Sequence, residues 1–214
     1  ATDLVAKKAK IRAAAECVER YCLRQHRKWI YGSYNKLSKK HKLYDLQPFE
    51  EFEKNIKLKW TKVFDVKRKK VIYIPLQFVI VPAKFSDIFQ GEQEIIPITS
   101  NGAAYGNSYY GAVERGLLEI IERDAAMLWW FTKRKLPRIM LNTKLTEKLE
   151  KYFELYNLKL FVLNATSDFN VPVMITIIVD ETGIGPAVIV GTGCSLNAEK
   201  AVIKSILEAY QGRI

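Results

Sequence analysis

The sequence predicts an α+β fold, in which long helices pack on antiparallel or mixed β-sheets. Segments rich in β-formers follow one another directly, which favours hairpins over a doubly wound parallel sheet. Helix-like segments are separate from these pairs along the chain. The 214 residues, 49% hydrophobic and 27% charged, have the composition of a folded globular domain.

Helix signals are strongest at the two long periodic segments. Asp3 can cap the first helix, and Pro137 follows the end of the central one, as a stop signal should. The first helix has an apolar stripe made of Ile11, Ala15, Val18 and Cys22. The apolar side expected for the central helix consists of Val113, Leu117, Ile120, Ile121 and Leu128, with the aromatic residues 129–131 in the core. The expected helices are residues 3–28, 49–54, 108–133, 146–156 and 198–211.

Strand signals fall in two groups. Residues 60–66 and 71–81 predict a hairpin whose turn, residues 67–70, is basic. Residues 158–164, 172–180 and 187–190 predict a second group, with a glycine-rich turn at residues 181–186.

Charge and composition narrow the function classes. The net charge of +11 fits a solvated lysine-rich surface, or attraction of an anionic ligand or an acidic peptide. No nucleic-acid-binding motif is present, so nucleic acid is not an expected partner. The longest apolar run is too short to span a bilayer, and the first residues lack a signal-peptide pattern. Three cysteines without a CxxC spacing argue against a zinc site and indicate a reducing compartment, so we expect a cytoplasmic protein.

A Glu-x-x-Glu-Arg pattern occurs twice, and an altered version ends the chain. The copies are Glu16, Glu19 and Arg20; Glu119, Glu122 and Arg123; and Glu208, Gln211 and Arg213. A spacing of three places both acids of a pair on one side of a helix. Two such pairs facing one cavity would hold magnesium and a triphosphate, whereas on a solvated surface they would be ordinary ion pairs. The near match at Glu147, Glu150 and Lys151 shows how easily the pattern arises, so spacing alone leaves both interpretations open.

A loop with glycine and asparagine precedes the central helix. Residues 100–108 could present backbone N–H groups and the positive end of the helix dipole to an anion. The loop is neither a Walker A motif nor a dinucleotide fingerprint. A simple capping turn would have the same composition.

These segments together resemble the YcaO-domain family. The central motif is SNGAAYGN at residues 100–107 followed by GLLEIIERDA at residues 116–125. AAAECVERY at residues 13–21 and LEAYQGR at residues 207–213 resemble the first and third ATP-binding motifs. The resemblance implies a single YcaO-like domain over residues 1–214, lacking N- and C-terminal portions of the full family domain.

The resemblance also implies a ligand set, with ATP and Mg²⁺ as cofactors. The metal ligands it implies are Glu16, Glu19, Glu119, Glu122 and Glu208. The ATP-binding residues it implies are these five with Arg20, Asn107, Arg115, Arg123, Gln211 and Arg213. Gly111 departs from the pattern, because the family usually places an acidic metal ligand there. No nucleophile–histidine arrangement can be argued, so catalytic residues stay unassigned.

The implied reaction is ATP-dependent activation of a peptide backbone amide, which forms azoline rings in a ribosomally made peptide. One alternative is thioamidation or methylthiolation with a sulfur-donating partner. Another is a non-catalytic YcaO scaffold that binds a partner or leader peptide. The substrate would be a peptide or protein, and the resemblance is compatible with a homodimer.

Overall fold

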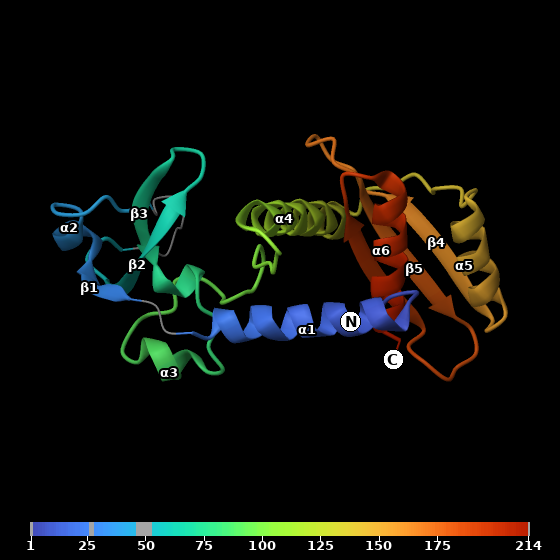
Figure 1. The fold of residues 1–214 in the computed structure, drawn as a ribbon, viewed down its shortest axis with the longest axis horizontal. Helices are drawn as coiled ribbons and strands as arrows, with labels where there is room; N and C mark the ends of the chain where they lie inside the picture. The colour runs from blue at the N-terminus through green and yellow to red at the C-terminus, as the bar shows by residue number, and fades with distance from the viewer. Residues whose placement is uncertain (1, 26–27, 46–52, 214) are drawn as a thin grey trace. The chain divides into compact units, whose positions relative to one another are not determined.

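The computed structural model describes residues 2–25, 28–45 and 53–213 (Figure 1). Backbone contacts divide the chain into two compact units. One contains Ala1–Glu16 with Asn101–Ile214, and the other is Cys17–Ser100. Helices and antiparallel sheets occur together, which confirms the predicted α+β class. The expected helix at residues 49–54 falls mostly outside the described residues.

The unit Cys17–Ser100 is built on a three-stranded antiparallel sheet of order β1-β2-β3. The strands are β1 (Trp29–Ser33), β2 (Lys57–Asp65) and β3 (Lys70–Pro75), and the short helices are α2 (Tyr34–Leu37), η1 (Leu76–Phe78) and α3 (Phe85–Phe89). The predicted hairpin with its basic turn is confirmed as β2 and β3. Its second strand ends at Pro75, earlier than expected, because the chain turns there into η1.

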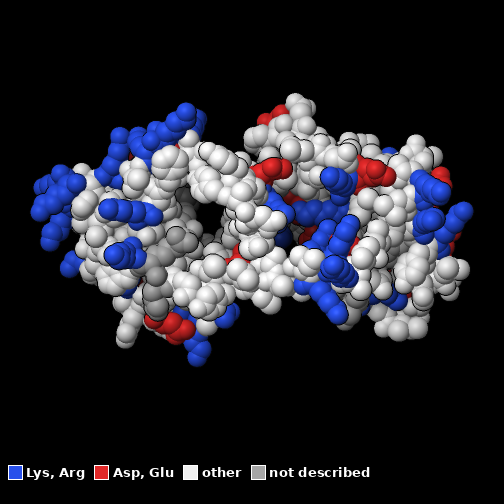
Figure 2. All heavy atoms as spheres, viewed as in Figure 1, with Lys and Arg blue, Asp and Glu red and all other residues white. Residues whose placement is uncertain are grey.

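One core cluster of this unit lies on the sheet face that carries Leu58 and Trp60, and a second contains Leu76, Ile80 and Phe89. Leu58 and Trp60 of β2 are fully buried, and the Trp60 indole N–H donates to the Gly32 carbonyl at 3.0 Å. That bond attaches β1, which the sequence did not predict because it is short and two of its aromatic residues are exposed. Figure 2 shows lysine and arginine side chains gathered around α2 and the β2–β3 turn, where residues 67–69 are exposed.

The other unit contains a second antiparallel sheet of order β4-β5-β6. Its strands are β4 (Leu158–Asn164), β5 (Val173–Asp180) and β6 (Val188–Cys194), close to the predicted positions. β6 extends four residues beyond its expected end, into the glycine-containing segment that precedes α6. Gly191 and Gly193 lie in the strand because α6 crosses it closely: a Cβ on Gly191 would lie 2.2 Å from the Ala209 nitrogen.

Helices cover both faces of this sheet. α5 (Lys144–Glu154) and α6 (Ala198–Gln211) bury the face that carries Met174 and Ile178. α4 (Tyr109–Thr132) packs through Leu118, Ile121 and Ala125 on the opposite face. All three lie close to their predicted ranges, with Ser108, Thr143 and Asn197 as their N-caps.

Two predictions about helix faces are wrong. α1 (Ala6–Leu23) ends before residue 28 and buries none of its residues, so its apolar stripe is largely exposed. In α4, Leu117, Ile120 and Leu128 are exposed, whereas the buried residues are Gly116, Glu122 and Ala125. Of the aromatic run that ends α4, Trp129 packs against the core cluster, and Trp130 and Phe131 are exposed.

The reason for the second error is that Glu122 has polar partners on the sheet. A helical wheel ranks an acidic residue as solvent-facing, but hydrogen bonds to a buried carboxylate remove that preference. Within the described part of the chain, no helix is long and apolar enough to cross a membrane.

Candidate functional site

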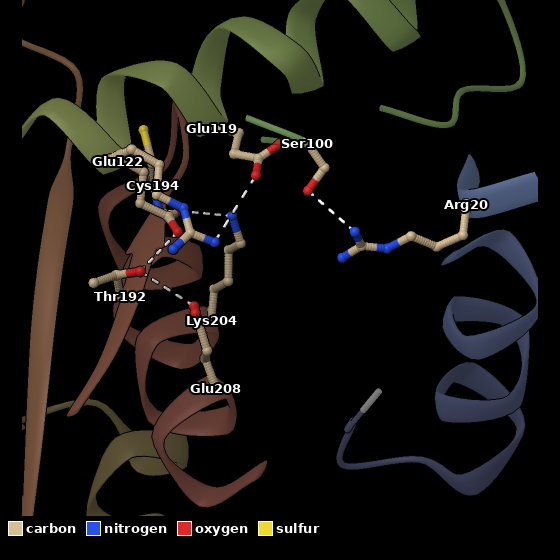
Figure 3. Close-up of polar contacts among 9 residues, drawn as sticks. Arg20, Ser100, Glu119, Glu122, Thr192, Cys194, Lys204 and Glu208 are labelled. Atoms are coloured by element: carbon tan, nitrogen blue, oxygen red, sulfur yellow. Dashed lines mark hydrogen bonds and ion pairs between the residues drawn. The ribbon is translucent and has the colours of Figure 1, made fainter. Parts of the chain in front are cut away.

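Glu122 is the centre of a polar cluster between α4, β6 and α6 (Figure 3). Its side chain is 4% exposed. Oε1 accepts from the Thr192 hydroxyl at 2.8 Å, while Oε2 accepts from the Cys194 backbone N–H and from the Lys204 ammonium, each at 2.7 Å. A buried carboxylate needs such partners, because an unpaired buried charge is strongly unfavourable.

Glu208 of α6 approaches the same hydroxyl from the other side. The Thr192 hydroxyl lies 3.3 Å from Glu208 Oε2 and 2.8 Å from Glu122 Oε1, so one side chain links two carboxylates (Figure 3). Burial raises the pKa of Glu208, and the charge of Glu122 raises it further. Nearby Arg123 and Lys204 act in the opposite direction. The carboxylates of the second and third motif copies therefore lie within electrostatic reach of each other.

The first motif copy adds Glu16 to the same unit. Glu16, Glu208 and Gln211 line one hollow of about 600 Å³, together with Arg12 and Lys204. An exposed glutamate beside a partly buried one and several cations can attract both a cation and phosphate groups. The structure thus brings together predicted residues that are about two hundred positions apart in sequence.

The other half of the second motif copy is more exposed. Glu119 is half-buried, and one of its oxygens lies 3.9 Å from an Arg123 nitrogen, at the outer limit of an ion pair. Arg123 itself is exposed. A long, solvated contact of this kind contributes little to stability.

The loop before α4 is held to the helix from within this unit. The Arg115 guanidinium donates to the Tyr105 carbonyl at 2.9 Å, and Gly116 allows Gly102 to approach, since a Cβ there would lie 2.5 Å from the Gly102 oxygen. Asn107 is exposed at the end of the loop. Arg115 thus supports the loop backbone, a role that the sequence did not predict.

Gly111 occupies the third position of α4. Its N–H donates to the N-cap hydroxyl of Ser108 at 3.1 Å. The helix begins as predicted, and the position that carries an acid in the family pattern contributes only this backbone contact.

Two predicted residues belong to the other unit, and a third has a different partner. Glu19 and Arg20 belong to the unit Cys17–Ser100, where Arg20 donates to the Ser100 hydroxyl at 3.1 Å. Arg213 is ion-paired with the buried carboxylate of Asp180, and it does not line the hollow that contains Glu16 and Glu208. Hydrogen bonds from Thr182, and then the contact with Arg213, lower the pKa of Asp180 to about 2.

The sequence did not indicate Thr192 or Lys204 as site residues. Thr192 lies beyond the predicted end of the strand, and Lys204 is one lysine among many. One signal was available: Lys204 precedes Glu208 by four residues, so both lie on one face of α6. The thiol of Cys194 is no candidate nucleophile, because burial, and next the charge of Glu122, raise its pKa to about 11.

The donor set fits magnesium shared with a polyphosphate. Mg²⁺ prefers hard oxygen ligands, and proteins usually supply one or two carboxylates while substrate phosphates and water complete the octahedron. Among the described residues, no three His, Cys, Asp or Glu side chains form a group able to hold a metal ion. Glu122 and Glu208, joined through Thr192, suit the shared arrangement better than a closed protein cage.

Comparison with known families decides the assignment. Residues 4–214 match the model of the YcaO family, described as YcaO cyclodehydratases that bind ATP and Mg²⁺. The chain belongs to the YcaO family. This confirms the resemblance seen in the three motifs, and it supports ATP and Mg²⁺ as the cofactors of this YcaO chain.

Solved structures agree with the YcaO fold. The heterocyclase TruD superposes with a TM-score of 0.77 at 20% identity, covering 95% of this chain and 33% of TruD. The YcaO protein of Methanopyrus kandleri, bound with AMPPCP and Mg²⁺, superposes with a TM-score of 0.74 at 21% identity, covering 98% of this chain and 53% of that protein.

A curated relative is similar in sequence. It is an uncharacterized protein of Methanothermobacter thermautotrophicus, 28% identical over 163 residues, which cover 73% of this chain and 41% of the relative. The chain therefore spans less than half of the length of this relative.

Proposed function

We propose that this chain takes part in ATP- and Mg²⁺-dependent activation of a peptide backbone amide, giving azoline rings in a ribosomally made peptide. The observation that carries the proposal is the meeting of Glu122 and Glu208 at the Thr192 hydroxyl. Two motifs that define the family by sequence supply these carboxylates from different helices. Surface ion pairs would not require a buried carboxylate at that position.

The proposed cofactor site is the region around this cluster. Glu122, Glu208, Glu119 and Glu16 would hold Mg²⁺, and Arg123 and Gln211 would contact the nucleotide. Mg²⁺, when bound, would neutralise the charge of the triphosphate. The roles of Glu19, Arg20, Asn107 and Arg115 rest on the family resemblance.

The proposed reaction balances without a protein nucleophile. A Cys, Ser or Thr side chain of the substrate adds to the preceding amide carbon, and the amide oxygen takes the negative charge. That oxygen accepts the γ-phosphoryl group of ATP and then leaves as phosphate while the amide nitrogen forms the C=N bond. The side-chain S–H or O–H proton and the amide N–H proton pass to solvent, so the products are the azoline, ADP and phosphate. Positioning and charge neutralisation dominate such phosphoryl transfers, which suits a site of carboxylates and arginines.

Gly111 favours a second candidate, a YcaO scaffold that binds a partner or leader peptide without catalysis. The position that carries an acidic metal ligand in the family pattern has no side chain here. A site with one carboxylate fewer would bind the metal–nucleotide complex more weakly. Binding of ATP with Mg²⁺ separates this scaffold from the catalytic proposal.

The first experiment is a thermal unfolding series with ATP, Mg²⁺ and both together. We expect stabilisation only with both, loss of that stabilisation in Glu119→Gln, and wild-type behaviour in Glu147→Gln. Glu147 is a matched control because it belongs to the exposed near match on α5. Absence of any stabilisation in the wild type would contradict the catalytic proposal.

The second experiment identifies the chemistry. A substrate peptide carrying ¹⁸O in the reacting amide should transfer the label to phosphate, because ordinary ATP hydrolysis takes its oxygen from water. A product that has lost one water indicates an azoline. A product in which sulfur replaces oxygen indicates the thioamide alternative, with a sulfur-donating partner.

A further inference from the structure

The Lys204 ammonium already occupies a cation position on Glu122. Its Nζ lies 2.7 Å from Glu122 Oε2, and the Lys204 side chain is 45% exposed while that of Glu122 is 4% exposed. Figure 3 shows the lysine side chain extending from α6 toward the carboxylates of α4. The buried carboxylate of Glu122 is thus neutralised by the ammonium group of Lys204, whose long side chain is partly exposed to solvent.

The partners of Glu122 differ in how easily they can leave. A carboxylate can accept about four hydrogen bonds, and three donors are present here. The Cys194 N–H is a backbone donor of β6, which pairs with β5, so it is held in place by the sheet. The Thr192 hydroxyl projects from the same strand and can turn only between Glu122 and the neighbouring Glu208. Lys204 can withdraw by rotating its own side chain.

Space and an alternative anion are available for that movement. Lys204 lines the hollow that contains Glu16 and Glu208, and it also lines a second hollow of about 430 Å³ with Arg12 and Lys200. If a triphosphate occupies the proposed site, its oxygens give the ammonium a new partner.

We propose that Lys204 is the resident counter-ion of Glu122, which a divalent metal must displace, so that metal binds weakly until nucleotide arrives. The proposal rests on the proposed function, since it assigns Glu122 to the metal. Its consequence is coupling: the tethered cation competes with free Mg²⁺, while the nucleotide phosphates draw the lysine away. Lys204 is thus a positioning residue that makes metal and nucleotide bind together.

The test of this proposal is a titration with Mn²⁺ in the absence of nucleotide. The electron paramagnetic resonance signal of free Mn²⁺ measures how much of the ion is bound. Lys204→Met should bind Mn²⁺ about tenfold more tightly than the wild type, within the usual range for coupled sites. Lys200→Met is the matched control, one turn earlier on α6, and should equal the wild type. Lys204→Gln keeps a hydrogen-bond donor without the charge and should also bind more tightly, which provides a second variant if the methionine variant fails to fold.

The outcomes separate the two proposals. If the wild type binds Mn²⁺ with a non-hydrolysable ATP analogue but neither Lys204 variant gains affinity for Mn²⁺ alone, the counter-ion proposal is wrong and the ATP site stands. If the wild type does not bind Mn²⁺ even with the analogue, the proposed function itself fails. If Lys204 only stabilises the fold, Lys204→Met should have a lower melting temperature that Mn²⁺ does not restore. Our proposal instead expects Mn²⁺ to restore the melting temperature of this variant.

Discussion

The two Glu-x-x-Glu-Arg copies share a sequence pattern but lie in different environments. In α4, Glu122 is buried against β6 and accepts from three donors. In α1, which buries no residue, the first acid of the other copy, Glu16, is exposed at the edge of a hollow, whereas its equivalent in α4, Glu119, is half-buried. The comparison teaches that the pattern selects helix and spacing, while the packing partner decides whether a glutamate becomes a fixed part of the structure.

The largest predicted effect is a difference in the free energy of unfolding between alanine variants of Glu122 and Glu16. Glu122→Ala should lower the free energy of unfolding by about 2–4 kcal/mol, because it leaves the Cys194 N–H without its acceptor and Lys204 without its counter-charge. Glu16→Ala should change it by no more than about 0.5 kcal/mol, as for other exposed positions. Urea unfolding of both variants, without nucleotide or metal, measures the difference.

Equal losses of unfolding free energy in Glu122→Ala and Glu16→Ala would contradict this prediction. A large loss for Glu16 would mean that α1 depends on that side chain, and a small loss for Glu122 would mean that its contacts are not formed in solution. Far-UV circular dichroism of each variant checks that the fold persists before the energies are compared.

A smaller effect on stability is expected at Arg213, the arginine of the third copy. The pKa of Asp180 is about 2, because Thr182 and then Arg213 favour its charged form. A lowered pKa gives stability that is present above about pH 4 and is lost as the pH falls through about 2. Arg213→Met should therefore be less stable than the wild type at neutral pH, with a gap that closes in acid.

The neighbouring exposed pair supplies the control for this measurement. Lys159 and Glu181 lie 2.6 Å apart with both side chains more than half exposed, so Lys159→Met should have little effect at any pH. Arg213→Met should also keep the stabilisation by ATP with Mg²⁺, because its guanidinium is bound to Asp180. Loss of that stabilisation would instead support the ATP contact implied by the family resemblance.

Much of the fold was predictable from local signals. The range of α4 followed from its periodicity and from the stop signal at Pro137, and the basic turn between β2 and β3 followed from its flanking β-formers. The errors lie where tertiary contacts override those signals. Gly191 and Gly193 lie beyond the predicted end of the strand, but they belong to β6, where they allow the close approach of α6.

The site was predictable in its acids and not in their partners. Spacing and family resemblance selected Glu122 and Glu208, since acidic pairs on helices are visible in a sequence. Thr192 and Lys204 were not visible, because only the antiparallel pairing of β6 and the crossing of α6 bring them to Glu122. The same packing shifts the buried face of α4 away from Leu117, Ile120 and Leu128 and onto Glu122 and Ala125, so a helical wheel alone could not have found the buried carboxylate.

The smallest predicted effect concerns Gly111, which lies in the same helix as Glu122 but in its first turn. Gly111→Glu should raise the free energy of unfolding by about 0.5–1 kcal/mol, because glycine is a poor helix former and a glutamate three residues after Ser108 completes a capping box. The added Cβ would lie 3.2 Å from the Ser108 hydroxyl oxygen, a tight contact that a small shift can relieve. Gly111→Gln has the same shape and can form the same cap, so the two variants should be similarly stable. Only the glutamate should strengthen stabilisation by ATP with Mg²⁺, as measured by thermal unfolding. If glutamine does the same, the gain comes from the helix start and not from a restored metal ligand.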